Sequence, residues 1–355
     1  MNKNPKQNYK YELDSLRGVA AFLIVLLHAT SYLFPMVGGA INEMTPALGR
    51  AYLFVDMFFI LSGLVLALNY FDEFQKLSIA KLRSFLKKRL LRIYPLHLIT
   101  LILLVILFWG LDFRLEGEMS ILTNKTTLLL NSMLLHSSGL LDQGCLNCTS
   151  WNYPSWSISV EWIGYLFLPF IFRFANWTMK PLVVSAFMGL ACLYFFVELS
   201  QGDLDFASII GLARCFTGMI FGVVIYKMPP TKIPAALVLS GVILGLHFIP
   251  IDSIMIISLI LLVYAAYNAE GKSILNNSIF LYLGSRSYSL YMIHAVVQFF
   301  GMYIWEKIYG SRISQFSFSE QIFGLGVYLL LVLMISELSY RTFEVKLAKV
   351  LRRIT

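Results

Sequence analysis

Long apolar segments follow one another along most of the chain, each about as long as a helix that crosses a membrane. A helical span needs roughly 20 mostly apolar residues. Ten segments have this character, at about 15–34, 52–70, 93–111, 157–174, 181–199, 207–225, 234–250, 253–268, 286–305 and 321–340. The segment 121–135 is shorter and more polar, so we expect an interfacial or re-entrant helix there. The pattern predicts an all-α, polytopic membrane helix bundle of about ten transmembrane helices.

The composition agrees with a membrane protein. Of the 355 residues, 58% are hydrophobic and 14% are charged, whereas about 25% of a soluble domain is charged. No stretch between the apolar segments is long enough to fold separately, so we expect a single membrane domain over residues 1–355. The N-terminal segment is basic and then apolar, like a signal peptide, but it lacks a small-residue cleavage site. We therefore expect an uncleaved first helix.

The distribution of lysine and arginine predicts the orientation. Of the 28 such residues, 22 fall on one side of the predicted bundle, in segments 1–17, 71–92, 173–180, 226–232, 270–286 and 341–355. The positive-inside rule places that side, with both chain ends, in the cytoplasm. The net charge of +8 is therefore a sign of membrane topology and does not indicate a nucleic-acid partner.

The first predicted span carries two ionisable residues, Arg17 and His28. Eleven residues correspond to about three helical turns, so the two side chains share one face, about 16 Å apart. Asp14 lies one turn before Arg17 and can pair with it. Arg17 could simply extend to the membrane surface, and His28 could be a hydrogen-bonded packing residue. However, ionisable groups inside a bilayer are costly, and an imidazole is a natural proton acceptor.

The second predicted span has Ser62 and Gly63 at its middle, and Gly63 allows a close approach of another backbone. A basic run follows at the cytoplasmic side: Lys81, Arg83, Lys87, Lys88, Arg89 and Arg92. The positive-inside rule explains most of these residues. Alternatively, they form a site for a phosphorylated ligand, because arginine side chains suit phosphate oxygens.

Two later spans also carry polar side chains. Glu161 enters the fourth span one turn after Ser157, and a buried glutamate needs a histidine, an arginine or a substrate hydroxyl as its partner, in a site or in a fold-stabilising pair. In the ninth span, three polar residues share one helical face, which is typical of a cavity lining: Ser287, Tyr291 and His294. The pairs Gly218–Gly222 and Gly241–Gly245 predict close helix packing.

No metal site is expected. The five histidines have no metal-ligand spacing, and the sequence lacks a phosphate-binding loop, an H-E-x-x-H motif and a G-x-S-x-G motif. Cys145 and Cys148 lie in the predicted external loop 136–155. One such pair is weak evidence for zinc, and either a disulfide or two free thiols is possible.

These residues also form an ordered set of motifs. The set comprises Arg17-x10-His28, Phe58-Phe59-x-x-Ser62-Gly63 after Asp56, a basic run ending in Arg92-Ile93-x-Pro95, Trp156-Ser157 through Glu161, Ser287-Tyr288-x-x-Tyr291-x-x-His294, and a terminal Arg341 and Glu344. In this order, over residues 12–346, the chain resembles the acyltransferase-3 family of integral membrane acyltransferases. One departure, Lys87-Lys88-Arg89 where more arginine is common, leaves open which basic residue contacts a ligand.

The resemblance implies transfer of an acyl group, most often acetyl, from cytoplasmic acyl-CoA (acetyl-CoA) to a hydroxyl of a cell-surface glycan or similar acceptor. It implies a multi-pass protein of the bacterial cytoplasmic (inner) membrane. His28 would be the general base, or would carry the acyl group covalently. Glu161 would orient the imidazole or hold the acceptor. Arg17 would take part in catalysis and would also bind the donor, together with Lys88, Arg89, Arg92 and Ser62. The substrate cavity would be lined by Asp14, Ser157, Tyr291 and His294.

A different class of protein, an exporter or transporter of glycans or small molecules, would also have many spans and a polar interior. Inverted repeats or paired broken helices would favour that class, and the sequence displays neither. The acceptor, the acyl group and the oligomeric state are not predictable from these residues.

Overall fold

The computed structural model describes residues 10–113, 123–139, 151–175, 179–200, 204, 208–231, 233–249, 251–269, 274–347 and 349–350, and this part contains helices and no strands. The long helices are α1 (Tyr11–Tyr32), α3 (Phe54–Tyr70), α4 (Ile79–Val105), α7 (Trp156–Ala175), α8 (Met179–Ser200), α9 (Ser208–Lys227), α10 (Ala235–Phe248), α11 (Asp252–Tyr267), α13 (Ser287–Tyr309) and α14 (Phe318–Ser339). Each overlaps one predicted span, so the predicted all-α bundle is confirmed, although α4 begins fourteen residues before its predicted span 93–111 and includes the basic run.

Within the described residues, seven helices are long and apolar enough to cross a membrane, and α10 and α11 are apolar but shorter. Helix α13, which carries the polar face around His294, is not among the seven. The polar segment predicted as a short helix contains α6 (Lys125–Ser132). Its last turn packs on α4, where Nε2 of His97 lies 2.8 Å from the carbonyl oxygen of Asn131.

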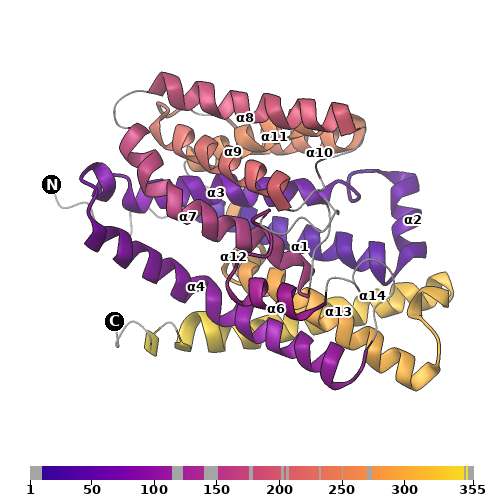
Figure 1. Ribbon diagram of the computed structural model, residues 1–355. Helices are drawn as coiled ribbons and strands as arrows, with labels where there is room; N and C mark the ends of the chain where they lie inside the picture. The colour runs from indigo at the N-terminus through magenta and orange to yellow at the C-terminus, as the bar shows by residue number, and fades with distance from the viewer. Residues whose placement is uncertain are drawn as a thin grey trace.

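The long helices form one bundle, with α8 at the edge opposite α4, α13 and α14 (Figure 1). Shorter helices connect or cover them, among them α2 (Pro35–Met44), α12 (Ser278–Ser285) and the single turn η4 (Tyr153–Ser155). Helix α14 continues from Tyr340 to Leu347 as the π-helix η7. The charge of Glu344 in η7 acts on Arg17 near the start of α1, so the two described ends of the chain lie at the same end of the bundle.

Glycines let α3 and α9 pack with their backbones in contact. A Cβ atom at Gly222 would collide with the carbonyl oxygen of Ile60, and one at Gly63 would collide with the backbone of Met219. Gly218 faces α3 in the same way, so the predicted close-packing role of the Gly218–Gly222 pair is confirmed. In the second predicted pair, Gly241 has open space around its Cβ position, so it makes no close helix contact.

Replacing Gly222 by leucine should therefore separate α3 from α9, since the new side chain meets backbone that cannot move aside. Overpacking costs about 1–3 kcal/mol or more. The temperature at which half of the detergent-purified protein loses its monodisperse chromatographic peak should fall. Gly241→Leu is the matched control and should leave that temperature nearly unchanged. Equal tolerance of both variants would contradict this packing.

A buried ion pair explains two other intramembrane charges. Both carboxylate oxygens of Asp56 accept hydrogen bonds from Arg214, at 3.0 and 2.7 Å, and Arg214 is only 1% exposed. Arg214 also donates to the carbonyl oxygen of Leu204, while the backbone N–H of Leu204 donates to Asp252 at 2.8 Å. Arg50 donates to the same Asp252 carboxylate. These charges join α3, α9 and α11 and have a structural role.

Candidate active site

Two histidines from different helices meet in the bundle. Nδ1 of His28 in α1 lies 2.9 Å from Nε2 of His294 in α13. His294 is fully buried, whereas His28 is partly exposed. The ring of Tyr153 stands edge-on to both imidazoles, and its hydroxyl donates to Gln298 at 2.8 Å. The predicted base and the predicted lining residue His294 are therefore direct neighbours.

Hydrogen bonds fix the segment that carries Tyr153. The side-chain amide of Asn152 donates to Thr100 at 3.1 Å and to the backbone carbonyl of Met292 at 3.2 Å. Five residues further along, the Ser157 hydroxyl lies 2.9 Å from that of Tyr291. The start of α7 is thereby attached to α4 and α13, and two of the predicted lining residues contact each other.

Glu161 lies deeper in α7 and meets α3. The hydroxyl of Ser62 donates to Glu161 at 2.6 Å, and the neighbouring Tyr165 also interacts with Glu161. The negative charge of Glu161 acts on Arg17. Residues that the sequence assigned to separate motifs therefore form one cluster, in which Glu161 has Ser62 as its hydrogen-bond partner.

Charges converge at the end of the bundle that is predicted to face the cytoplasm. The charges acting on Arg17 are those of Arg92, Asp14, Glu161 and Glu344. Arg92 is exposed and Arg17 is partly exposed. Within the described residues, the guanidinium groups of Arg17 and Arg92 form no hydrogen bond or close ion pair. Two neighbouring guanidinium groups with open donors are suited to bind an anion.

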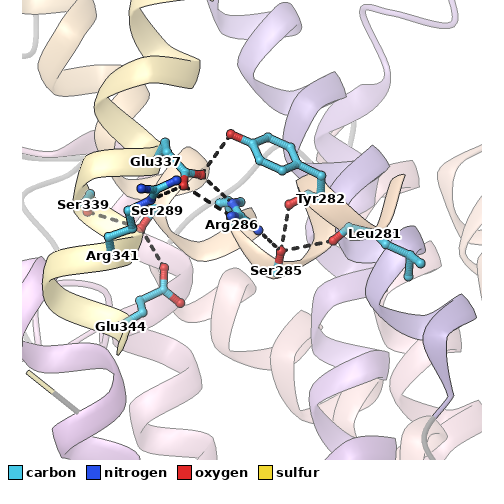
Figure 2. A network of polar contacts seen from close by, with 9 residues as sticks. All are labelled: Leu281, Tyr282, Ser285, Arg286, Ser289, Glu337, Ser339, Arg341 and Glu344. Carbon is cyan, nitrogen blue, oxygen red and sulfur yellow. Dashed lines mark hydrogen bonds and ion pairs between the residues drawn. The ribbon is translucent and has the colours of Figure 1, made fainter. Parts of the chain in front are cut away.

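The π-helix η7 brings Glu344 to this place. Figure 2 shows the Ser289 hydroxyl between Ser339 and Glu344; it donates to Glu344 at 2.6 Å and lies 3.2 Å from the Ser339 hydroxyl. Seven residues before Glu344, Glu337 accepts a hydrogen bond from Arg286 at 2.6 Å. The C-terminal helix is thus attached to the start of α13 by two polar contacts, and Glu344 is held beside the arginines.

The basic side chains of α4 have two different surroundings. The guanidinium group of Arg89 donates to the Tyr70 hydroxyl at 3.3 Å and lies over the Tyr70 ring. The ammonium group of Lys88 lies 6.0 Å from the centre of the same ring. The positive charge of Arg92, in contrast, acts on Arg17. Of the predicted donor-binding residues, Arg17 and Arg92 lie together, whereas Lys88 and Arg89 lie with Tyr70.

Sequence reasoning missed several residues near the site. No motif spacing marks Tyr153, whereas Gln298 lies one turn after His294 and could have been found by extending the polar face of that helix. A second histidine pair, His97 and His136, stacks in parallel with ring centres 5.8 Å apart. Burial beside His97 lowers the pKa of His136 to about 3, so that imidazole is neutral at physiological pH.

Within the described residues, no group of three or more potential ligands could hold a metal ion. Cys145 and Cys148 lie outside those residues.

A histidine pair, Glu161 and two arginines thus lie among the helices of one membrane bundle. The chain matches the family described as an acyltransferase domain, acyltransferase-3, over residues 10–337. It therefore belongs to the acyltransferase-3 family, as the motif order predicted, and is a multi-pass membrane acyltransferase.

Several curated proteins are similar to the chain. Acyltransferase MdmB of Streptomyces mycarofaciens is 26% identical over 81% of this chain and 79% of its own length. A Staphylococcus aureus protein whose name assigns it as an O-acetyltransferase is 22% identical over 98% of this chain, which spans 58% of that relative. Protein 2 in the picA locus of Rhizobium radiobacter is 37% identical over 30% of this chain and 50% of its own length. No solved structure shows a significant match.

Proposed function

We propose that this protein is an O-acyltransferase that moves an acyl group, in the first place acetyl, from cytoplasmic acyl-CoA to a hydroxyl of a cell-surface glycan or related carbohydrate. We place it in the bacterial inner membrane. The observation that carries the proposal is the pair of open guanidinium groups of Arg92 in α4 and Arg17 in α1, the helix that also bears His28. The names of two relatives, an acyltransferase and an O-acetyltransferase, support the reaction class.

The donor fits this arrangement in charge and in length. Coenzyme A carries phosphates at one end and its thioester at the end of a flexible arm. The phosphates would bind Arg17 and Arg92, and the arm would extend along α1 toward His28, about 16 Å away along the helix. Glu344 and Glu161 balance the charges of the arginines before the donor binds.

The reaction needs one base and a confined place. His28 would remove the proton from the acceptor hydroxyl as the hydroxyl oxygen attacks the thioester carbonyl carbon. The carbon–sulfur bond breaks, the CoA thiolate leaves, and the proton on His28 returns to the sulfur. Ser62, Ser157 and Tyr291 would line the passage, and holding both substrates in one orientation would supply much of the remaining rate.

Arg92→Ala and Arg17→Ala should each weaken acetyl-CoA binding by about 10- to 100-fold, since each removes a charged hydrogen-bond donor worth about 1.5–3 kcal/mol. Calorimetric titration of the purified protein in nanodiscs measures this loss. Arg83→Ala is the matched control, because Arg83 is an exposed arginine of α4, the helix that carries Arg92. Arg89→Ala should have a smaller effect, since Arg89 is turned toward Tyr70.

The same preparation separates the enzyme from the exporter considered above. Membership of an acyltransferase family favours the enzyme. Release of free CoA that depends on an added sugar acceptor would support acyl transfer. If folded wild-type protein binds no acyl-CoA, the donor site is refuted and the exporter becomes the better explanation.

A further inference from the structure

The hydrogen bond between His28 and His294 has one direction, which the α13 backbone sets. Nδ1 of His294 lies 3.3 Å from the carbonyl oxygen of Leu290, one turn earlier. A carbonyl oxygen only accepts hydrogen bonds, so this contact requires a proton on Nδ1 of His294. A neutral imidazole carries a single ring proton. Nε2 of His294 is therefore an acceptor, and Nδ1 of His28 is the donor.

The geometry of the two rings suits that bond. Their planes differ by 2° and their centres lie 5.1 Å apart, with 2.9 Å between Nδ1 of His28 and Nε2 of His294. The rings consequently lie edge to edge in nearly one plane, and the hydrogen bond follows the lone-pair direction of the acceptor. With its proton on Nδ1, His28 keeps the lone pair on Nε2. This is the less common tautomer of a free histidine side chain, so an acceptor at Nδ1 is needed to select it.

Within the described residues, no charged side chain contacts His28 in place of His294. Four tyrosines of this part of the chain surround the pair: Tyr32, Tyr153, Tyr291 and Tyr328. Among the described residues, His294 is the only titratable group whose charge acts on His28. Glu161, the residue that the sequence suggested for orienting the imidazole, hydrogen-bonds with Ser62 in α3.

We infer that His294 is a positioning residue for the acyl transfer, holding His28 in the tautomer whose Nε2 is the basic atom. The inference deepens the proposed function and rests on it. The acceptor hydroxyl then approaches the Nε2 edge of His28, which faces away from α13. After His28 takes up the proton, its Nδ1–H still donates to a neutral imidazole and not to a carboxylate. The imidazolium is therefore weakly stabilised and returns its proton readily to the leaving thiolate.

The test compares two substitutions of His294. Leucine removes the acceptor, whereas glutamine keeps a carbonyl oxygen within reach of the His28 N–H. His294→Leu should lower kcat by about 10- to 100-fold with KM for acetyl-CoA nearly unchanged, and His294→Gln should recover most of the loss. His247→Leu is the control, because His247 is a half-buried histidine of α10 that contacts Thr45. Its kcat should match the wild type.

Nitrogen-15 NMR of histidine-labelled protein reads the tautomer directly, with His28 assigned by its absence in His28→Ala. The wild type should display a protonated Nδ1 and an unprotonated Nε2, and His294→Leu should shift His28 toward the opposite form. A protonated Nε2 in the wild type would overturn the inference, as would equal losses of kcat in both His294 variants. A wild type without acyl transfer would refute the proposed function, while the spectrum would still decide whether His294 sets the tautomer.

Discussion

Replacing His28 by alanine is expected to lower kcat for acyl transfer by about 10²- to 10⁴-fold, the range that a positioned general base contributes. Binding of acetyl-CoA should change little, because its phosphates are placed at Arg17 and Arg92, at another level of the bundle. Initial rates of CoA release, measured with a thiol reagent beside calorimetric binding, separate the two effects.

His247→Ala controls for loss of a membrane histidine and should be fully active. Full acyl transfer by His28→Ala would remove the general-base assignment. The covalent alternative predicts an acyl group on His28 in wild-type protein that has been mixed with acetyl-CoA alone and quenched rapidly. Mass spectrometry of the peptide containing His28 detects such a group, whereas general-base chemistry leaves the peptide unmodified.

The largest effect on stability is expected for Asp56→Ala. This change leaves the guanidinium group of Arg214, which is 1% exposed, without its carboxylate partner. Breaking a buried pair in this way costs about 3–5 kcal/mol. The unfolding transition of the purified protein, followed by intrinsic fluorescence on heating, should move to clearly lower temperature.

An exposed pair of the same protein provides the comparison. Glu306 lies 3.8 Å from Arg312, and both side chains are more than a third exposed, so Glu306→Ala should cost at most about 1 kcal/mol. The double variant Asp56→Leu with Arg214→Leu should recover much of the stability lost in Asp56→Ala, since no charge is then left unpaired. If Asp56→Ala is as stable as Glu306→Ala, the pair does not have the structural role assigned to it.

The helices of this protein were predictable because the cost of an unsatisfied backbone in lipid forces each apolar segment of sufficient length to become a helix. That rule acts within one segment. It does not say which segments become neighbours, because lipid and leucine are equally apolar and helix contacts depend on side-chain fit. The backbone contact between α3 and α9 was foreseen only as far as Gly63, Gly218 and Gly222 permitted a close approach.

The site was predictable to the same extent. Spacing along α1 placed Arg17 and His28 on one face, since that is a property of one helix. It could not indicate the rotation of α13 or α7 relative to α1, and these rotations decide that His294, and not Glu161, is the hydrogen-bond partner of His28. Tyr153 lies in a single helical turn outside the periodic segments, so no pattern marked it.

The π-helix at the end of α14 makes the spacing of residues there as important as their identity. In an α-helix, residues five positions apart point about 140° away from each other, so Ser339 and Glu344 could not both contact Ser289. The π segment accommodates an additional residue and brings them to the same side. Inserting one residue between Tyr340 and Glu344 would turn the carboxylate by about a further 100° and move it away from both arginines. Such an insertion removes no charged group that acts on Arg17, and this stretch should therefore tolerate substitutions better than insertions.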